Sequence, residues 1–196
     1  MKELNDLLVN DNVDVSLTSP ADYSFRKIKS LYMADRARPR SMRIGKEVIR
    51  GPNDKIVSNS LWLNHNNLES FNGVVAFCNK IFEAPSKIKW LDLSYNAIED
   101  ISDEILKFKE LQILYLHGNC IDNMLDILKL KSLKNLKTLT LHGCPIETVP
   151  FYRQKMVYLL PQVKNLDFVT ITPREAVAPA PPGARELLKV YEGEEK

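Results

Sequence analysis

Four stretches of the chain repeat one pattern of apolar and polar positions: LWLNHNNL at 61–68, LDLSYNAI at 91–98, LYLHGNCI at 114–121 and LTLHGCPI at 139–146. In each stretch apolar and polar residues first alternate, as in a strand that is buried on one face only. An Asn or Cys follows at a fixed place. The pattern predicts four short strands, each ending in a turn whose Asn or Cys side chain bonds the backbone of neighbouring coils.

The repeat fits the template L-x-x-L-x-L-x-x-N/C-x-L of leucine-rich repeats. The matching residues are Ile88, Leu91, Leu93, Asn96 and Ile98 in one copy, Leu111, Leu114, Leu116, Asn119 and Ile121 in the next, and Leu136, Leu139, Leu141, Cys144 and Ile146 in the last. One copy cannot bury its own leucines, whereas stacked copies share a continuous core. We therefore predict an α/β leucine-rich repeat solenoid, with a curved parallel sheet of about five strands and helices and loops on its convex side.

The segments that flank the strands complete this domain. Residues 71–82 and 98–111 carry apolar residues at helical spacing, which predicts short helices on the convex side. Residues 151–175 show a helical apolar pattern, a stop at Pro161 and a last half-repeat, so we expect a C-terminal cap there. We place the repeat domain with its cap at 58–175, and a Pro-rich linker with a short C-terminal tail at 176–196.

The cap resembles the one that ends the cytoplasmic subgroup of leucine-rich repeat proteins, which phosphatase-regulatory and spliceosomal members typify. More specifically, DYSFRKI at 22–28, SLWLNHNNL at 60–68 and WLDLSYN at 90–96 resemble the family of leucine-rich repeat-containing protein fifty-one. Cys144 departs from that family, where Asn is commoner, and the tail after 175 shows no resemblance to it. The resemblance implies a non-enzymatic, cytoplasmic interaction protein of a larger assembly, in particular of the ciliary or flagellar axoneme. The alternative is an adaptor subunit of a ribonucleoprotein or phosphatase complex.

Charge is unevenly distributed along the chain. The net charge is only +2, but residues 26–55 hold ten basic residues against three acidic ones. We interpret 1–57 as a basic, partly extended N-terminal arm that contacts an acidic surface, for which tubulin, nucleic acid and an acidic protein all qualify. The alternative is a solvated linker. The basic candidates are Arg36, Arg38, Arg40, Arg43, Lys46 and Arg50.

The register of the repeats predicts which side chains share the concave face. Residues between the core leucines line up in three columns: Ser60, Trp90, Ile113, Thr138 and Asn165; Trp62, Asp92, Tyr115, Thr140 and Asp167; and Asn64, Ser94, His117, His142 and Val169. Exposed large aromatic residues on a rigid sheet are typical of interfaces. We therefore predict a partner-binding face made of Trp62, Trp90, Asp92, Tyr115, His117, Thr140, His142 and Asp167. The alternative is that the N-terminal arm covers these residues, which would then serve packing only.

Several function classes lack their signature. His117 and His142 share a column, but a zinc site needs three or four converging ligands, so we expect no metal and no cofactor. The chain has no catalytic motif, and Asp92 and Asp167 would stand about 14 Å apart, too far for paired-carboxylate chemistry. Nucleic acid is not expected, because the arm has few aromatic residues among its basic ones. No signal peptide or membrane span is evident, and three widely spaced cysteines fit an intracellular protein with reduced thiols.

Overall fold

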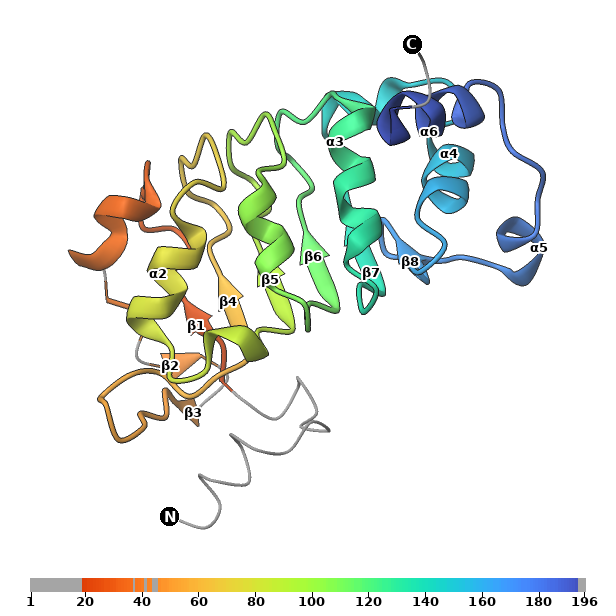
Figure 1. Ribbon diagram of the computed structural model, residues 1–196. Helices are drawn as coiled ribbons and strands as arrows, with labels where there is room; N and C mark the ends of the chain where they lie inside the picture. Colours follow the sequence, from red (N-terminus) through yellow and green to blue (C-terminus); the bar gives the residue numbers. More distant parts are fainter. Residues whose placement is uncertain (1–18, 37, 41, 44–45, 194–196) are drawn as a thin grey trace.

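The computed structural model describes residues 19–36, 38–40, 42–43 and 46–193 (Figure 1). It confirms the predicted leucine-rich repeat fold of the α/β class. One sheet has the strand order β1-β4-β5-β6-β7-β8-β9, parallel throughout except for the final pair. Its strands are β1 (Ala21–Asp22), β4 (Ser60–Trp62), β5 (Trp90–Asp92), β6 (Ile113–Tyr115), β7 (Thr138–Thr140), β8 (Asn165–Leu166) and β9 (Val169–Thr170).

The predicted register is confirmed at the core positions. Leu61, Leu91, Leu114, Leu139 and Leu166 pair one after another across the sheet, and each is buried. The residues on either side of these leucines point to the other face, because successive side chains of a strand alternate. Every coil thus contributes its leucine to one continuous core.

The side chains that follow the strands form the predicted ladder. Asn96 donates from Nδ2 to the carbonyl oxygens of Leu63 (3.1 Å) and Leu93 (2.9 Å) and accepts from the Leu68 N–H (3.0 Å). Asn66 and Asn119 bond neighbouring coils in the same way. Cys144 replaces Asn with longer contacts, 3.3 Å to the Leu116 carbonyl and 3.4 Å from the Asn119 N–H. Each of these side chains therefore joins its coil to the preceding coil by hydrogen bonds.

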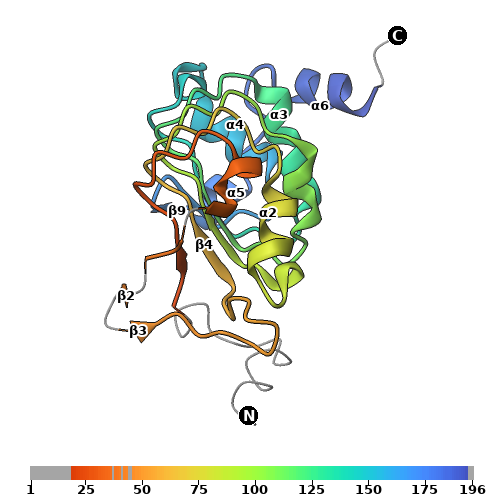
Figure 2. The ribbon, with the colours of Figure 1, turned by 90° about the vertical axis from the view of Figure 1, so that its left-hand side faces the viewer.

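Helices cover one face of the sheet (Figure 2). They are η2 (Leu31–Arg36), α2 (Val74–Ile81), η3 (Pro85–Lys87), η4 (Asp103–Lys107), α3 (Met124–Lys129), η5 (Leu130–Ser132) and η6 (Pro145–Thr148), where η marks a 3₁₀ helix. The convex helices predicted in 71–82 and 98–111 are present as α2 and η4. Glu104 links these two helices, because its carboxylate accepts from the N–H groups of Gly73 (3.0 Å) and Val75 (3.1 Å) at the start of α2.

The expectation of an arm over 1–57 needs correction. Residues 19–36 fold as one more coil, whose strand β1 pairs with β4. Tyr23 and Ile28 are buried where the template has its apolar residues, and Asn66 accepts from the Arg26 and Ile28 N–H groups. Along the sequence, the segment that connects this coil to β4 contains a separate two-stranded sheet of β2 (Met42–Arg43) and β3 (Lys46–Glu47). The first 18 residues of the expected arm lie outside the described residues.

The C-terminal part also folds onto the repeats. The cap consists of α4 (Tyr152–Leu159), β8, β9 and α5 (Pro173–Ala176), and the tail then forms α6 (Ala184–Glu192). The predicted short tail is not an isolated extension, because α6 packs on α3 and α4 of its own chain (Figure 1). Ala184 is fully buried, Leu187 and Leu188 pack against the core, and the Lys131 ammonium lies 3.1 Å from the Glu192 carboxylate. The apolar face of α6 is therefore covered by the repeat domain itself.

Candidate partner-binding face

Trp62, Trp90 and Tyr115 form one diagonal aromatic row across β4, β5 and β6. All three lie on the face that alternation predicts, but Trp90 stands in the column next to that of Trp62 and Tyr115. The ring centroids of Trp62 and Trp90 are 5.1 Å apart with planes at 64°, and those of Trp90 and Tyr115 are 5.7 Å apart at 76°. Phe168 ends the row, 5.3 Å from Tyr115. Edge-to-face contacts of this kind stabilise aromatic pairs and fix the rings. The three predicted residues are half-buried against one another, so they form a continuous surface instead of separate projections.

A second aromatic row runs along the turns that follow the strands. Phe25, His65 and Tyr95 stack with centroid distances of 4.3 and 4.4 Å and nearly parallel planes. Tyr95 meets His117 edge-on at 5.1 Å, and His117 stacks on His142 at 4.6 Å. Phe168 packs against both of these histidines, so the two rows converge at the cap. Phe25, Tyr95 and Phe168 expose 54%, 49% and 59% of their surface, respectively.

Backbone geometry explains why this second row exists. The residue before each ladder position has positive φ: Phe25 (56°), His65 (52°), Tyr95 (52°), Gly118 (68°) and Gly143 (72°). Non-glycine residues adopt this conformation rarely and at some cost. The turn directs the three side chains along the edge of the stack, where their rings face one another. We did not predict Phe25, His65, Tyr95 or Phe168 as site residues; the glycines at 118 and 143 were the sequence signal that this position is special.

His117 and Thr140 lie together beneath the face. The His117 Nδ1 is 2.8 Å from the Thr140 Oγ1, which also accepts from the Leu116 N–H at 3.3 Å. Burial and the neighbouring His142 lower the pKa of His117 to about 4, so its imidazole is neutral at pH 7. Thr140 is fully buried and His117 nearly so. The Thr140 side chain, which we predicted as part of the partner-binding face, is therefore covered in the structure and supports His117.

Asp167, a predicted partner-binding residue, makes several hydrogen bonds within its own chain. Its Oδ1 accepts from the N–H groups of Leu141 (2.6 Å) and His142 (2.9 Å), and its Oδ2 accepts from the Tyr152 hydroxyl (2.9 Å). The Nδ1 of His142 lies 3.4 Å from Oδ1 but makes no hydrogen bond. Burial and this carboxylate raise the pKa of Tyr152 far above its usual value. Because φ is positive at both Asp167 and Phe168, the chain reverses there, and Val169 lies in the antiparallel β9 instead of continuing the third column.

Asp92 lies on the face between the aromatic side chains of Trp62 and Tyr115, with which it pairs in register. Its carboxylate accepts from the Ser94 N–H (3.0 Å) and the Ser94 hydroxyl (2.6 Å). Burial raises the pKa of Tyr115, and the Asp92 charge adds to this effect. Asp92 thus gives the aromatic surface one negatively charged group.

The described part of the basic segment reaches one end of this face. Arg38, Arg40 and Arg50 are exposed. The Arg40 guanidinium lies over the Phe25 ring at 5.5 Å, and its backbone N–H donates to the Asp22 carbonyl (2.8 Å). Arg50 pairs with Asp54 instead (3.6 Å). The side chains of Arg36, Arg43 and Lys46 lie outside the described residues, so Arg40 is the candidate that the structure places beside the aromatic rows.

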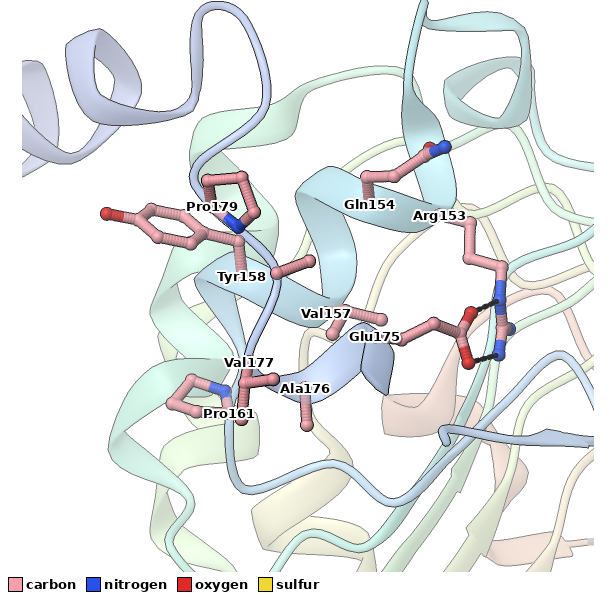
Figure 3. A pocket seen from close by; sticks show the side chains of 10 residues that line it. Arg153, Gln154, Val157, Tyr158, Pro161, Glu175, Ala176, Val177 and Pro179 are labelled. Carbon is pink, nitrogen blue, oxygen red and sulfur yellow. Dashed lines mark hydrogen bonds and ion pairs between the residues drawn. The ribbon is translucent and has the colours of Figure 1, made fainter. Parts of the chain in front are cut away.

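A cavity of about 370 Å³ lies elsewhere, between α4 and the chain that follows α5 (Figure 3). Val157, Tyr158 and Pro161 form one wall, and Val177 and Pro179 form the other. At one end the Arg153 Nε donates to the Glu175 carboxylate at 2.6 Å, and this contact holds the pKa of Glu175 at about 2. Within the described residues we found no cluster of three or more His, Cys, Asp or Glu side chains that fits a metal ion, and no helix long and apolar enough to cross a bilayer.

Comparison with known proteins agrees with this geometry. A model of the family described as "Leucine-rich repeat" matches residues 72–193. Leucine-rich repeat-containing protein 51 of Macaca mulatta is 35% identical over 153 residues, covering 78% of this chain and 79% of the macaque protein. U2 small nuclear ribonucleoprotein A′ of Mycosarcoma maydis is 29% identical over 113 residues, 57% of this chain and 44% of that protein.

Among solved structures, a chain of the Drosophila melanogaster SNF/U2A′ complex superposes with a TM-score of 0.57 at 21% identity, covering 86% of this chain and 97% of that one. That likeness shows the fold alone. The sequence matches go further, because identity with the macaque protein extends over most of both chains. The chain belongs to the leucine-rich repeat proteins and, among them, to the family of leucine-rich repeat-containing protein 51.

Proposed function

We propose that this protein is a non-enzymatic adaptor that holds a segment of a partner protein against its aromatic face. The observation that carries this proposal is the pair of aromatic rows that converge at Phe168 and leave the rings of Phe25, Tyr95 and Phe168 about half exposed. Large aromatic rings at the centre of an interface supply much of its binding energy. Leucine-rich repeat proteins in general are modules for protein–protein interaction, which agrees with this role.

The rigidity of the rows favours binding. Each ring already contacts the rings on the neighbouring coils, so few rotamers remain to be lost when a partner docks. The neutral state of His117 adds to this, because a charged imidazole under the face would need desolvation. We expect the partner segment to cross the coils from Phe25 toward Phe168 and to present apolar side chains.

The assembly that contains this partner is a further part of the proposal. We propose a cytoplasmic assembly of the cilium or flagellar axoneme, with microtubule-associated proteins as neighbours, which is what the resemblance of residues 22–28, 60–68 and 90–96 implies. The second candidate is an adaptor of a ribonucleoprotein, which the match to U2 small nuclear ribonucleoprotein A′ favours. The two candidates differ in cellular compartment, so they can be separated directly.

The test is crosslinking mass spectrometry with the full chain in axonemal and nuclear fractions. Wild-type protein should crosslink to axonemal proteins, and the double variant Tyr95→Ser/Phe168→Ser should lose those crosslinks. Tyr32→Ser is the matched control, because Tyr32 is also an exposed aromatic residue (66%) but lies over Gly73 at the start of α2. Crosslinks that survive in the double variant as fully as in the Tyr32→Ser control would refute the aromatic face as the binding surface. Crosslinks confined to nuclear ribonucleoproteins would favour the second candidate.

A further inference from the structure

The two edges of the repeat sheet carry opposite charges. The segments that lead into β6, β7 and β8 bear exposed lysines, which we call the lysine rim: Lys107, Lys109, Lys134, Lys137 and Lys164. The turns on the other edge, after the Asn ladder, bear exposed carboxylates. In four successive coils an acidic residue follows the buried apolar residue, at Glu69, Glu99, Asp122 and Glu147. The acidic row arises because one repeat position recurs on four coils, whereas the lysines of the rim come from neighbouring positions in the segments before β6, β7 and β8.

Backbone hydrogen bonds bring the rim lysines together. The Lys137 N–H donates to the Gln112 carbonyl and the Lys164 N–H donates to the Lys137 carbonyl, both at 2.8 Å. Asn135 connects the next pair, because its Nδ2 donates to the Lys109 carbonyl at 3.0 Å. Adjacent coils in such a sheet stand about 4.8 Å apart, less than the screening length of about 8 Å in physiological salt. The fields of neighbouring lysines therefore add.

The rim lysines are not neutralised within the described part of the chain. None of the five makes an ion pair there, whereas Lys129 pairs with Asp126 (2.7 Å) and Lys131 with Glu192 (3.1 Å). The contacts of two rim ammonium groups are to carbonyl oxygens, from Lys137 to Lys134 (3.4 Å) and from Lys164 to Pro161 (3.2 Å). Like charges side by side are unfavourable unless a counter-charge arrives. Glu110 is the one acidic residue in the segments 107–113, 131–138 and 160–165, so positive charge exceeds negative charge on the rim.

The composition of the rim selects the kind of partner. The chain has no arginine between residues 51 and 152, so every cation of the rim is a lysine ammonium group, a compact point charge on a flexible stem. The rim segments 107–113, 131–138 and 160–165 expose no large hydrophobic residue, so nothing there would stack on bases or insert into a bilayer. Flexible ammonium groups at short spacing fit a row of carboxylates.

We propose that the lysine rim docks a glutamate- or aspartate-rich stretch of a partner polypeptide. The acidic row on the opposite edge repels the same stretch, so the solenoid approaches an acidic partner with the rim first. This surface is separate from the aromatic face, and the two bind independently. Contacts between exposed charges are individually weak, so several lysines must act together.

The test is fluorescence anisotropy with a labelled oligoglutamate and the full chain. The variant Lys109→Gln/Lys134→Gln/Lys137→Gln should bind about tenfold more weakly, from three exposed ion pairs lost together. The control Lys27→Gln/Lys29→Gln/Lys189→Gln has the same net charge at three other exposed lysines and should keep its affinity. Wild-type affinity should fall between about 50 mM and about 200 mM salt. The Tyr95→Ser/Phe168→Ser variant should bind oligoglutamate normally.

Four results would overturn the proposal. Equal losses in the two lysine variants would mean that only net charge matters. Tighter binding of single-stranded RNA of equal charge would assign the rim to phosphates, and tighter binding of phosphatidylserine-containing vesicles would assign it to a membrane surface. Absence of oligoglutamate binding at low salt, with unchanged circular dichroism, would exclude the surface altogether.

Discussion

Replacing Gly118 by Ala tests the aromatic row through a single methyl group. Gly118 has a φ of 68°, and a Cβ there would lie 2.8 Å from the Tyr95 Cδ1. The backbone conformation alone costs an alanine about 1–2 kcal/mol. Displacing the Tyr95 ring from its rotamer and from its stack on His65 adds roughly 1 kcal/mol. We therefore expect Gly118→Ala to lower the free energy of unfolding by about 2–3 kcal/mol.

Gly143→Ala supplies the matched control. Gly143 has nearly the same φ, 72°, but the nearest atom to its added Cβ, the Gly118 nitrogen, is 3.5 Å away. It should lose only the backbone part, about 1–2 kcal/mol. In a Tyr95→Ala background the two glycine variants should become equal, which urea unfolding followed by circular dichroism measures as a double-mutant cycle. If Gly118→Ala and Gly143→Ala cost the same with Tyr95 present, the ring does not lie where the structure puts it.

Three further outcomes are expected. Asn119→Ala removes two donors and one acceptor from buried backbone partners and should cost about 2–4 kcal/mol in urea unfolding. A loss no larger than that of Asn67→Ala, at an exposed position, would contradict the ladder. His117 has a folded-state pKa of about 4 against an ordinary 6.5, so the unfolded chain binds more protons between these values and stability falls as the pH drops through this window. The pH dependence of Tm should flatten there in His117→Gln, and an unchanged slope would place its origin elsewhere. Leu188→Ala on α6 should cost about 1–2 kcal/mol if the tail packs on the domain, whereas Val190→Ala, at an exposed position, should cost almost nothing.

Most of the repeat architecture could be predicted from the sequence because its signal is local and periodic. The first coil escaped prediction since Ala21 replaces the leucine of the template and Arg26 replaces the asparagine, so only Tyr23 and Ile28 retain the pattern. The apolar residues of α6 were visible, but a short helix does not reveal what it packs on. Packing of this segment on α3 and α4 became evident only from the folded chain.

The sequence predicted which residues of the candidate site share a face of the sheet, but it did not predict which of their side chains are exposed. Alternation within a strand placed Trp62, Trp90 and Tyr115 on one face, because side-chain direction follows from residue number alone. It could not reveal that Thr140 is covered by His117, or that Asp167 turns inward to bond two N–H groups and Tyr152. These outcomes depend on the size of neighbouring side chains and on positive φ angles at the cap.

The amino-acid sequence by itself determined the order, register and stacking direction of the coils, since each repeat must bury its leucines against the next. It also determined the charge of each edge, because a repeated position returns to the same edge on every coil. Only the tertiary structure decided which of the face residues remain accessible, how the rings of Phe25, His65 and Tyr95 stack, and where the two ends of the chain close the core. Those features arise from contacts between residues distant in sequence, and no local pattern encodes them.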